Sequence, residues 1–348
     1  MSTPAPTPPP TPTPTPTLLD WTNRRIDYLR ISVTDRCNER CTYCMPAELP
    51  DWQEKDEILT YEEILRIVRV TVALGFRKYR LTGGEPLVRR DLAWLIEQIG
   101  MIEGVESLGL STNGTLLAPL ASRLRAAGVD SVNISLDTLD ADTYARFTRG
   151  RWHECVAGID AAVTAGFPRV KLNAVLMRGM NDHEIPALVR FAHERGALIR
   201  FIELMPITTT QVLTPESFLS AQEAKALLER ETTLERLETK LGHGPAVYYR
   251  TAEGATVGFI GAMTDLHFCE SCNKVRLTAD GKLRPCLGNH LEFDLKGALR
   301  EASVAESPVA GGDRRLHEIF RHALGLKPLE HDFRGQYTPG RHMTAIGG

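Results

Sequence analysis

Short apolar runs alternate along this chain with stretches whose apolar residues recur at helical spacing. The runs are rich in Val, Ile and Leu, have the length of buried strands, and occupy 29–33, 78–82, 107–112, 131–136, 170–175 and 198–204. The amphipathic stretches between them predict helices at 61–74, 91–102, 116–127, 154–165 and 182–194. Because strand and helix alternate, we expect the six strands to pair in parallel through right-handed crossovers.

The number of repeats and their punctuation narrow the fold. Gly75, Gly128, Gly166 and Gly196 stand where helix C-caps are expected, each shortly before a strand. Six strand–helix units are fewer than the eight of a closed TIM barrel. The predicted fold class is therefore α/β, a partial open (β/α)6 TIM-like barrel, with a doubly wound α/β fold as the alternative. In either fold, ligands are expected at the carboxyl ends of the strands.

The alternation is confined to the middle of the chain. Residues 1–17 contain eight Pro and six Thr and no charged residue, so they predict an extended, disordered tail. Residues 18–206 carry the strand–helix units and form the expected barrel. Residues 207–348 lack the alternation and are expected to form a C-terminal extension. Within it we expect one helix and two short antiparallel strands, at 214–234, 247–250 and 256–260.

Composition excludes several classes of protein. The 348 residues include 41 Lys and Arg against 44 Asp and Glu, a net charge of −3, which excludes a globally basic nucleic-acid binder. No apolar run approaches about 18 residues, so we expect no membrane span. The chain starts with neither a secretory signal nor an arginine-rich transit peptide, and its cysteines are clustered. We therefore expect a cytoplasmic protein.

Three cysteines follow the first predicted strand in a Cys-x3-Cys-x2-Cys pattern: Cys37, Cys41 and Cys44. Three thiolates in one short loop can hold three irons of a [4Fe–4S] cluster and leave the fourth iron open to a ligand. Structural zinc needs four closed ligands, and no His lies within this loop. A thioredoxin-like Cys-x2-Cys pair would leave Cys37 unexplained. The spacing and the place after a strand therefore favour the cluster.

A second group has the pattern Cys-x2-Cys-x13-Cys and consists of Cys269, Cys272 and Cys286. One interpretation is a zinc ribbon with His267 or His290 as the fourth ligand. The interpretation that we favour is a second [4Fe–4S] cluster with an open iron.

Four cations interrupt the apolar strands: Arg30, Arg80, Lys171 and Arg200. An uncompensated cation inside a barrel would cost several kcal/mol, on the order of 5. Ion pairing with carboxylates, or exposure at a strand end, would explain any one of them. Four together predict convergence on a polyanion such as a nucleoside triphosphate, because arginine forks match phosphate geometry.

The loop 37–44, with Tyr43 before its last cysteine, resembles the radical S-adenosylmethionine (SAM) superfamily. The segment Thr82-Gly83-Gly84-Glu85-Pro86 resembles the GGEP motif of that superfamily, which binds the amino group of SAM. The resemblance implies that the open iron chelates the amino and carboxylate groups of SAM. Reduction would then cleave SAM to a 5′-deoxyadenosyl radical. The residues that this resemblance places in the SAM site are Tyr43, Gly84, Ser135 and Met205.

Within the superfamily, the span 29–348 resembles the GTP 3′,8-cyclases, lyases that open molybdenum-cofactor biosynthesis. The matching motifs are the segments 29–37, 79–87, 111–114, 133–137 and 200–206, the second cysteine group and the terminal Gly347-Gly348. The resemblance implies that the radical removes the ribose 3′ hydrogen of GTP. The carbon radical would then attack guanine C8 and give (8S)-3′,8-cyclo-7,8-dihydroguanosine 5′-triphosphate.

The same resemblance implies roles for individual residues. The expected GTP contacts are Arg30, Arg80, Thr112, Lys171, Lys274 and Arg276. The residues expected to take part in catalysis are Arg30, Lys171, Arg200, Gly347 and Gly348. The open iron of the second cluster would bind the guanine base, and the Gly-Gly end would thread into the site, where only residues without side chains fit. The family usually has Arg where this chain has Lys274, so we expect altered affinity or geometry at that position.

The partners and the alternatives follow from the same comparison. The resemblance implies a homodimer and product handover to the cyclic pyranopterin monophosphate synthase, but it identifies no reductant. One alternative is a radical SAM enzyme that modifies peptides and carries an auxiliary cluster. The basic strand residues and the Gly-Gly end argue against it. The other is a non-catalytic zinc-binding scaffold, in which the GGEP motif would have no use.

Overall fold

The six predicted strands lie side by side in chain order within one sheet. The computed structural model describes residues 17–45, 52–207, 212–239, 241–301, 310–335 and 337–347, so the expected tail at 1–16 lies outside the described residues. The strands are β1 (Tyr28–Ser32), β2 (Lys78–Thr82), β3 (Ser107–Thr112), β4 (Ser131–Ser135), β5 (Arg169–Leu176) and β6 (Leu198–Glu203). Each pairs in parallel with the next. In the described part of the chain the sheet does not close on itself, which confirms the partial open barrel.

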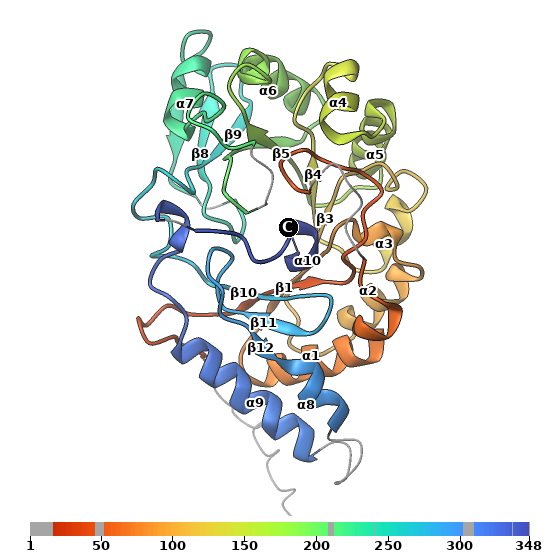
Figure 1. Ribbon diagram of the computed structural model, residues 1–348. Coiled ribbons are helices and arrows are strands. Elements are labelled where there is room, and N and C mark those ends of the chain that lie inside the picture. Colours follow the sequence, from red (N-terminus) through yellow and green to blue (C-terminus); the bar gives the residue numbers. More distant parts are fainter. Residues whose placement is uncertain are drawn as a thin grey trace, which may run out of the picture.

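The C-terminal extension continues this sheet at both edges. Beside β1 it adds β10 (Lys274–Leu277), β11 (Lys282–Arg284) and β12 (Phe293–Asp294). Beside β6 it adds β9 (Thr256–Ile260), β8 (Val247–Thr251) and β7 (Leu234–Leu237). The two strands that join the barrel, β10 and β9, run parallel to β1 and β6, and the outer ones are antiparallel. The extension therefore widens the barrel wall on both sides of its opening (Figure 1).

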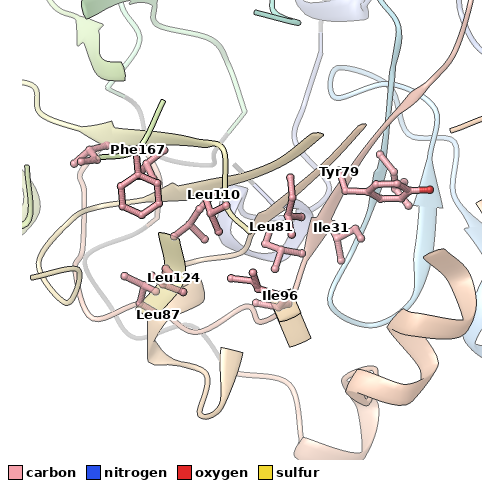
Figure 2. Packing of buried hydrophobic residues seen from close by; sticks show 14 of the residues in the cluster. Ile31, Tyr79, Leu81, Leu87, Ile96, Leu110, Leu124 and Phe167 are labelled. Carbon is pink, nitrogen blue, oxygen red and sulfur yellow. The ribbon is translucent and has the colours of Figure 1, made fainter. Parts of the chain in front are cut away.

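Helices that connect the strands cover the outer face of the sheet (Figure 1). They are α1 (Tyr61–Ala73), α2 (Leu92–Gly100), α3 (Ala121–Ala126), α4 (Ala141–Thr148), α5 (Trp152–Thr164) and α6 (Ile185–Glu194). Figure 2 shows the packing: Ile31, Leu81 and Leu110 from neighbouring strands share one buried cluster with Ile96 and Leu124 from α2 and α3. This apolar layer fixes the barrel wall.

The four strand cations take the alternate positions of these strands. On β1, Leu29 and Ile31 are fully buried in the apolar cluster, and Arg30 lies between them. On β2, Arg80 lies in the same way between two members of that cluster, Tyr79 and Leu81. Because side chains alternate across a strand, the cations point away from the helices and into the barrel.

The remaining helices are α7 (Ala221–Leu228), α8 (Leu295–Glu301), α9 (Ala310–Gly325) and α10 (Met343–Ile346). The predicted helix at 214–234 is wrong in both bounds: α7 begins after Ser220, which forms a capping box with Glu223, and residues 234–237 form a strand. α10 lies in the middle of the curved sheet (Figure 1). No helix among the described residues is long and apolar enough to cross a membrane.

Candidate active site

A cavity of about 380 Å³ is lined by residues of β1 to β6 and of the C-terminal extension. The predicted site residues on its wall are Arg30, Cys37, Cys41, Tyr43, Cys44, Arg80, Gly84, Thr112, Ser135, Lys171, Arg200, Met205, Cys269, Cys272, Lys274, Arg276 and Cys286. Gly347 reaches this wall through its carbonyl oxygen, which accepts a hydrogen bond from Arg276. Gly348 lies outside the described residues. The structure thus brings both cysteine groups and all six cations to one cavity.

The GGEP segment packs directly on the chain that leads into the first cysteine group. The backbone N–H of Gly84 donates to the carbonyl of Thr34 (2.9 Å), and that of Glu85 donates to the carbonyl of Arg36 (2.9 Å). A Cβ atom at Gly84 would lie 2.4 Å from the Arg36 carbonyl oxygen, so only glycine allows this approach. The motif therefore holds the start of the cysteine loop against the end of β2.

Glu85 ties the ends of β2 and β3 together. Its fully buried carboxylate accepts hydrogen bonds from Leu87 N (3.0 Å), Asn113 N (2.7 Å) and the Thr112 hydroxyl (2.8 Å). Burial raises the pKa of Glu85 to about 7, and these donors act in the opposite direction. The Thr112 hydroxyl, which we expected to contact GTP, thus has a structural partner of its own.

Tyr43 is oriented by a buried carboxylate on the other side of the cavity loop. Its hydroxyl donates to Asp137 Oδ2 (2.6 Å), and Asp137 Oδ1 accepts from the backbone N–H of Val175 (2.8 Å). Asp137 follows β4 and is 2 % exposed. The aromatic residue of the cysteine loop is therefore anchored to the ends of β4 and β5.

The thiols of the first group are a donor set that needs a cation. Burial raises the pKa of Cys37 and of Cys44 to about 12, and it raises the pKa of Cys41 well above its usual value. Bound iron would reverse these shifts, because thiolates are the ligands of iron–sulfur clusters. Within the described residues, no three His, Cys, Asp or Glu side chains are grouped to hold a single metal ion. The three cavity-lining thiols of this loop fit a cluster with one open iron.

The second cysteine group has a different electrostatic setting. Burial by itself would raise the pKa of Cys272, but the neighbouring Lys327 and Lys274 outweigh it and lower that pKa to about 7. His267 is exposed and hydrogen-bonded to Glu270, and His290 stacks on Tyr337. In the described part of the chain neither histidine lines the cavity. The group therefore presents three thiols beside fixed cations.

Three guanidinium groups stand side by side in strand register. Arg30 on β1 is opposite Arg80 on β2 and opposite Arg276 on β10. Arg80 is in turn opposite Gly109, where a Cβ atom would lie 2.3 Å from the Arg80 guanidinium. Gly109 therefore makes room for Arg80, which donates to Tyr28 Oη (2.6 Å), Leu110 O (2.6 Å) and Ser131 Oγ (2.7 Å).

The cations are partnered mainly by neutral groups, which leaves their charge for a ligand. Arg200 donates twice to Asn173 Oδ1 (2.6 and 2.9 Å), and Lys171 donates to the Leu241 carbonyl. Burial, followed by repulsion from neighbouring cations, lowers the pKa of Lys171 to about 7, that of Arg30 to about 9 and that of Arg276 to about 10. Crowded cations of this kind favour a polyanion.

Three cavity residues were not singled out from the sequence: Tyr28, Asn173 and Lys327. The positions of Tyr28 and Asn173 on cation-bearing strands could have indicated them, because both share the alternation of Arg30 and Lys171. Lys327 carries no such signal, since it follows α9 and reaches the cavity only through the tertiary fold.

The chain matches two family profiles in succession. The Radical SAM superfamily matches residues 31–192, and Molybdenum Cofactor Synthesis C matches residues 197–333. Among solved structures, that of Streptococcus suis SuiB bound to precursor peptide SuiA is similar with a TM-score of 0.57 at 16 % identity, over 90 % of this chain and 76 % of that one. At this identity the likeness shows the fold alone.

Curated relatives are much more similar in sequence. GTP 3′,8-cyclase of Moorella thermoacetica is 45 % identical over 94 % of this chain and 99 % of its own length. GTP 3′,8-cyclase of Pseudomonas putida is 46 % identical over 95 % of this chain and 98 % of its own length. With this identity over nearly the whole of each protein, the chain belongs to the GTP 3′,8-cyclase family of the radical SAM superfamily.

Proposed function

We propose that this chain is a GTP 3′,8-cyclase that carries out the first step of molybdenum-cofactor biosynthesis. The observation that carries this proposal is the single cavity on which two cysteine groups and six cations meet. A nucleoside triphosphate needs the cations, and radical chemistry needs the first cysteine group. The product would be (8S)-3′,8-cyclo-7,8-dihydroguanosine 5′-triphosphate.

Cys37, Cys41 and Cys44 would hold a [4Fe–4S] cluster, and Tyr43, Gly84, Ser135 and Met205 would line the site of SAM. With SAM bound, this cluster supplies the 5′-deoxyadenosyl radical that removes the ribose 3′ hydrogen. The chain itself supplies position. The Tyr43–Asp137 hydrogen bond fixes the cysteine loop, and the close contact between Gly84 and Arg36 fixes the loop that follows β2. Fixed walls keep the reacting groups together and exclude water.

The six cations would bind the triphosphate of GTP. Arg30, Arg80 and Arg276 form a row on adjacent strands, and Lys171, Arg200 and Lys274 line the same cavity. Because the arginine forks are anchored by carbonyl, hydroxyl and amide oxygens, they lose little freedom when phosphate binds. Gly347 would close the wall behind Arg276, and Gly348 would follow it into the site.

Cys269, Cys272 and Cys286 would hold a second [4Fe–4S] cluster whose open iron binds the guanine base. The cations beside Cys272 support this assignment, because they compensate the charge of thiolates. Holding the nucleotide at its base and at its phosphates would restrict its motion before reaction. We also propose that the protein is a cytoplasmic homodimer and passes its product to the cyclic pyranopterin monophosphate synthase.

The test is anaerobic turnover of the full chain, reconstituted with iron and sulfide, with SAM, dithionite and one candidate substrate at a time. The proposal predicts release of 5′-deoxyadenosine and the cyclised nucleotide with GTP, and neither with ATP or a peptide panel. Cys155→Ala, outside both cysteine groups, should retain this activity, whereas Cys44→Ala should abolish it. SAM cleavage that depends on a peptide and not on GTP would refute the proposal and favour a peptide-modifying enzyme.

A further inference from the structure

Lys327 lies on the cavity wall without a part in the proposed binding of GTP or SAM. It follows α9 and is 1 % exposed, which places it among the largest fully buried side chains of the protein. A buried ammonium group is costly unless its charge and its protons are compensated. The surroundings of Lys327 therefore show what this position is built to hold.

The three protons of the ammonium group have three acceptors. Lys327 Nζ lies 2.6 Å from the Pro285 carbonyl oxygen, 2.9 Å from the Lys274 carbonyl oxygen and 3.6 Å from Cys272 Sγ. Two of these acceptors are neutral. No carboxylate among the described residues forms an ion pair with Lys327, so the negative charge that balances it must come from the cysteine group.

Arg24 provides the contrast. Its guanidinium also approaches this region, but Asp20 Oδ2 lies 2.6 Å from its Nε and balances its charge. The other guanidinium nitrogens donate to Leu329 O (2.8 Å), Pro328 O (2.7 Å) and Cys269 O (3.1 Å). Arg24 thus holds the chain directly after Lys327, and Trp21 Nε1 donates to the carbonyl of Lys327 itself. These contacts fix the position of the ammonium beside Cys272.

We propose that Lys327 is a positioning residue of the second cluster, whose fixed charge stabilises the more negative, reduced form of that cluster. The inference rests on the proposed function, since it requires a [4Fe–4S] cluster on Cys269, Cys272 and Cys286. Hydrogen bonds to the sulfurs and the net charge nearby set the potential of such clusters. Charges interact strongly in a buried site, so one uncompensated cation at Cys272 raises the reduction potential.

The test uses the full chain with Cys37, Cys41 and Cys44 replaced by Ala, reconstituted with iron and sulfide, so that only the second group carries a cluster. Its one-electron reduction is titrated with redox mediators and followed by electron paramagnetic resonance. In Lys327→Met and Lys327→Gln the reduction equilibrium should shift at least tenfold toward the oxidised cluster, a drop of 59 mV or more. Lys282→Met, which removes a lysine paired with Asp294 and absent from the cavity wall, should match the parent.

Lys327→Gln separates charge from hydrogen bonding, because the amide keeps donors but not the cation. A parental potential in Lys327→Gln would overturn the inference and leave Lys327 as a strap between the Lys274 and Pro285 carbonyls. Iron content of the same samples is the second readout: cluster retention in Lys327→Arg with loss in Lys327→Met and Lys327→Gln supports the charge role. If the parent itself takes up zinc and no sulfide, the proposed second cluster fails, and the inference fails with it for a recognisably different reason.

Discussion

Arg276 donates a hydrogen bond to the carbonyl oxygen of Gly347 and so joins the C-terminal segment to β10. Arg276 is in register with Arg30, so Gly347 lies against the row of cations that we assign to the triphosphate. Earlier in the segment, Arg341 pairs with Asp280 and Glu292 (2.9 and 2.8 Å) and anchors it to the barrel edge. The end of the chain is therefore part of the cavity wall, and it is sensitive to side chains.

Gly347→Ala should impair catalysis without unfolding the protein. Gly347 has a φ of +74°, and a Cβ atom there would lie 3.0 Å from both Ser32 Cβ and Thr82 Cγ2. The left-handed conformation alone costs an L-residue about 1–2 kcal/mol, so we expect kcat/KM for GTP to fall about tenfold or more. Gly325→Ala, with no atom within 4 Å, is the matched control. A Gly347→Ala enzyme with parental kcat/KM would show that the tail does not shape the site.

Binding of GTP above pH 7 should take up a proton at Lys171. Burial, then repulsion from Arg200 and Arg80, lowers the pKa of the free Lys171 to about 7, and a bound triphosphate would raise it again. Affinity should therefore be constant below pH 7, where the ammonium is charged in both states, and should fall by up to about tenfold per pH unit above it. Calorimetry at pH 8 in buffers of different ionisation enthalpy measures the uptake. Lys171→Met should abolish it, and an unchanged uptake in that variant would assign the proton to another group.

Lys274 should bind phosphate as a point charge that Arg can replace. Its ammonium lies 5.7 Å from the centre of the Tyr28 ring on the cavity wall. Lys274→Arg supplies the bidentate fork, so the KM for GTP should fall or stay within about threefold of the parent. Lys274→Met removes the charge and should raise that KM at least about tenfold. Steady-state kinetics with varied GTP distinguish these outcomes, and a parental KM in Lys274→Met would exclude a phosphate contact.

Tyr43→Phe should destabilise the folded protein by about 1–3 kcal/mol. The substitution leaves Asp137 Oδ2 without the hydroxyl that lies 2.6 Å away, and an unsatisfied buried acceptor retains its desolvation cost. Urea unfolding of the iron-free protein gives the change in the free energy of unfolding. Tyr249→Phe is the control, since its hydroxyl forms no hydrogen bond with a described residue. Equal stability of the two variants would mean that the Tyr43–Asp137 bond contributes nothing.

Local patterns predicted the barrel because they act locally. Strands such as 78–82 were found within their bounds, since a run of buried residues between a helix C-cap and a turn has few alternatives. The C-terminal extension was predicted less well. Pro215 and Glu216 suggested a helix start, whereas the Ser220–Glu223 capping box is the one the structure uses. Helix α4 was not predicted at all.

The site was predictable where a residue contradicts its own surroundings. Arg30 and Arg80 are cations in apolar strands, and that conflict alone indicated a shared polyanion pocket. Their register with Arg276, and the space that Gly109 leaves for Arg80, depend on strand pairing and not on local sequence. Lys327 follows a helix and is as hydrophilic there as a surface lysine. Only tertiary packing shows that it is buried beside Cys272.

The most direct test of the central claim follows one hydrogen atom. The full chain, reconstituted anaerobically with iron and sulfide, is reduced with SAM and GTP that carries deuterium at the ribose 3′ position. We predict about eight irons per chain, a cyclised nucleotide that has lost this deuterium, and 5′-deoxyadenosine that has gained it. Formation of 5′-deoxyadenosine without deuterium, or at the same rate without GTP, would contradict abstraction from the ribose and with it the proposed cyclase reaction.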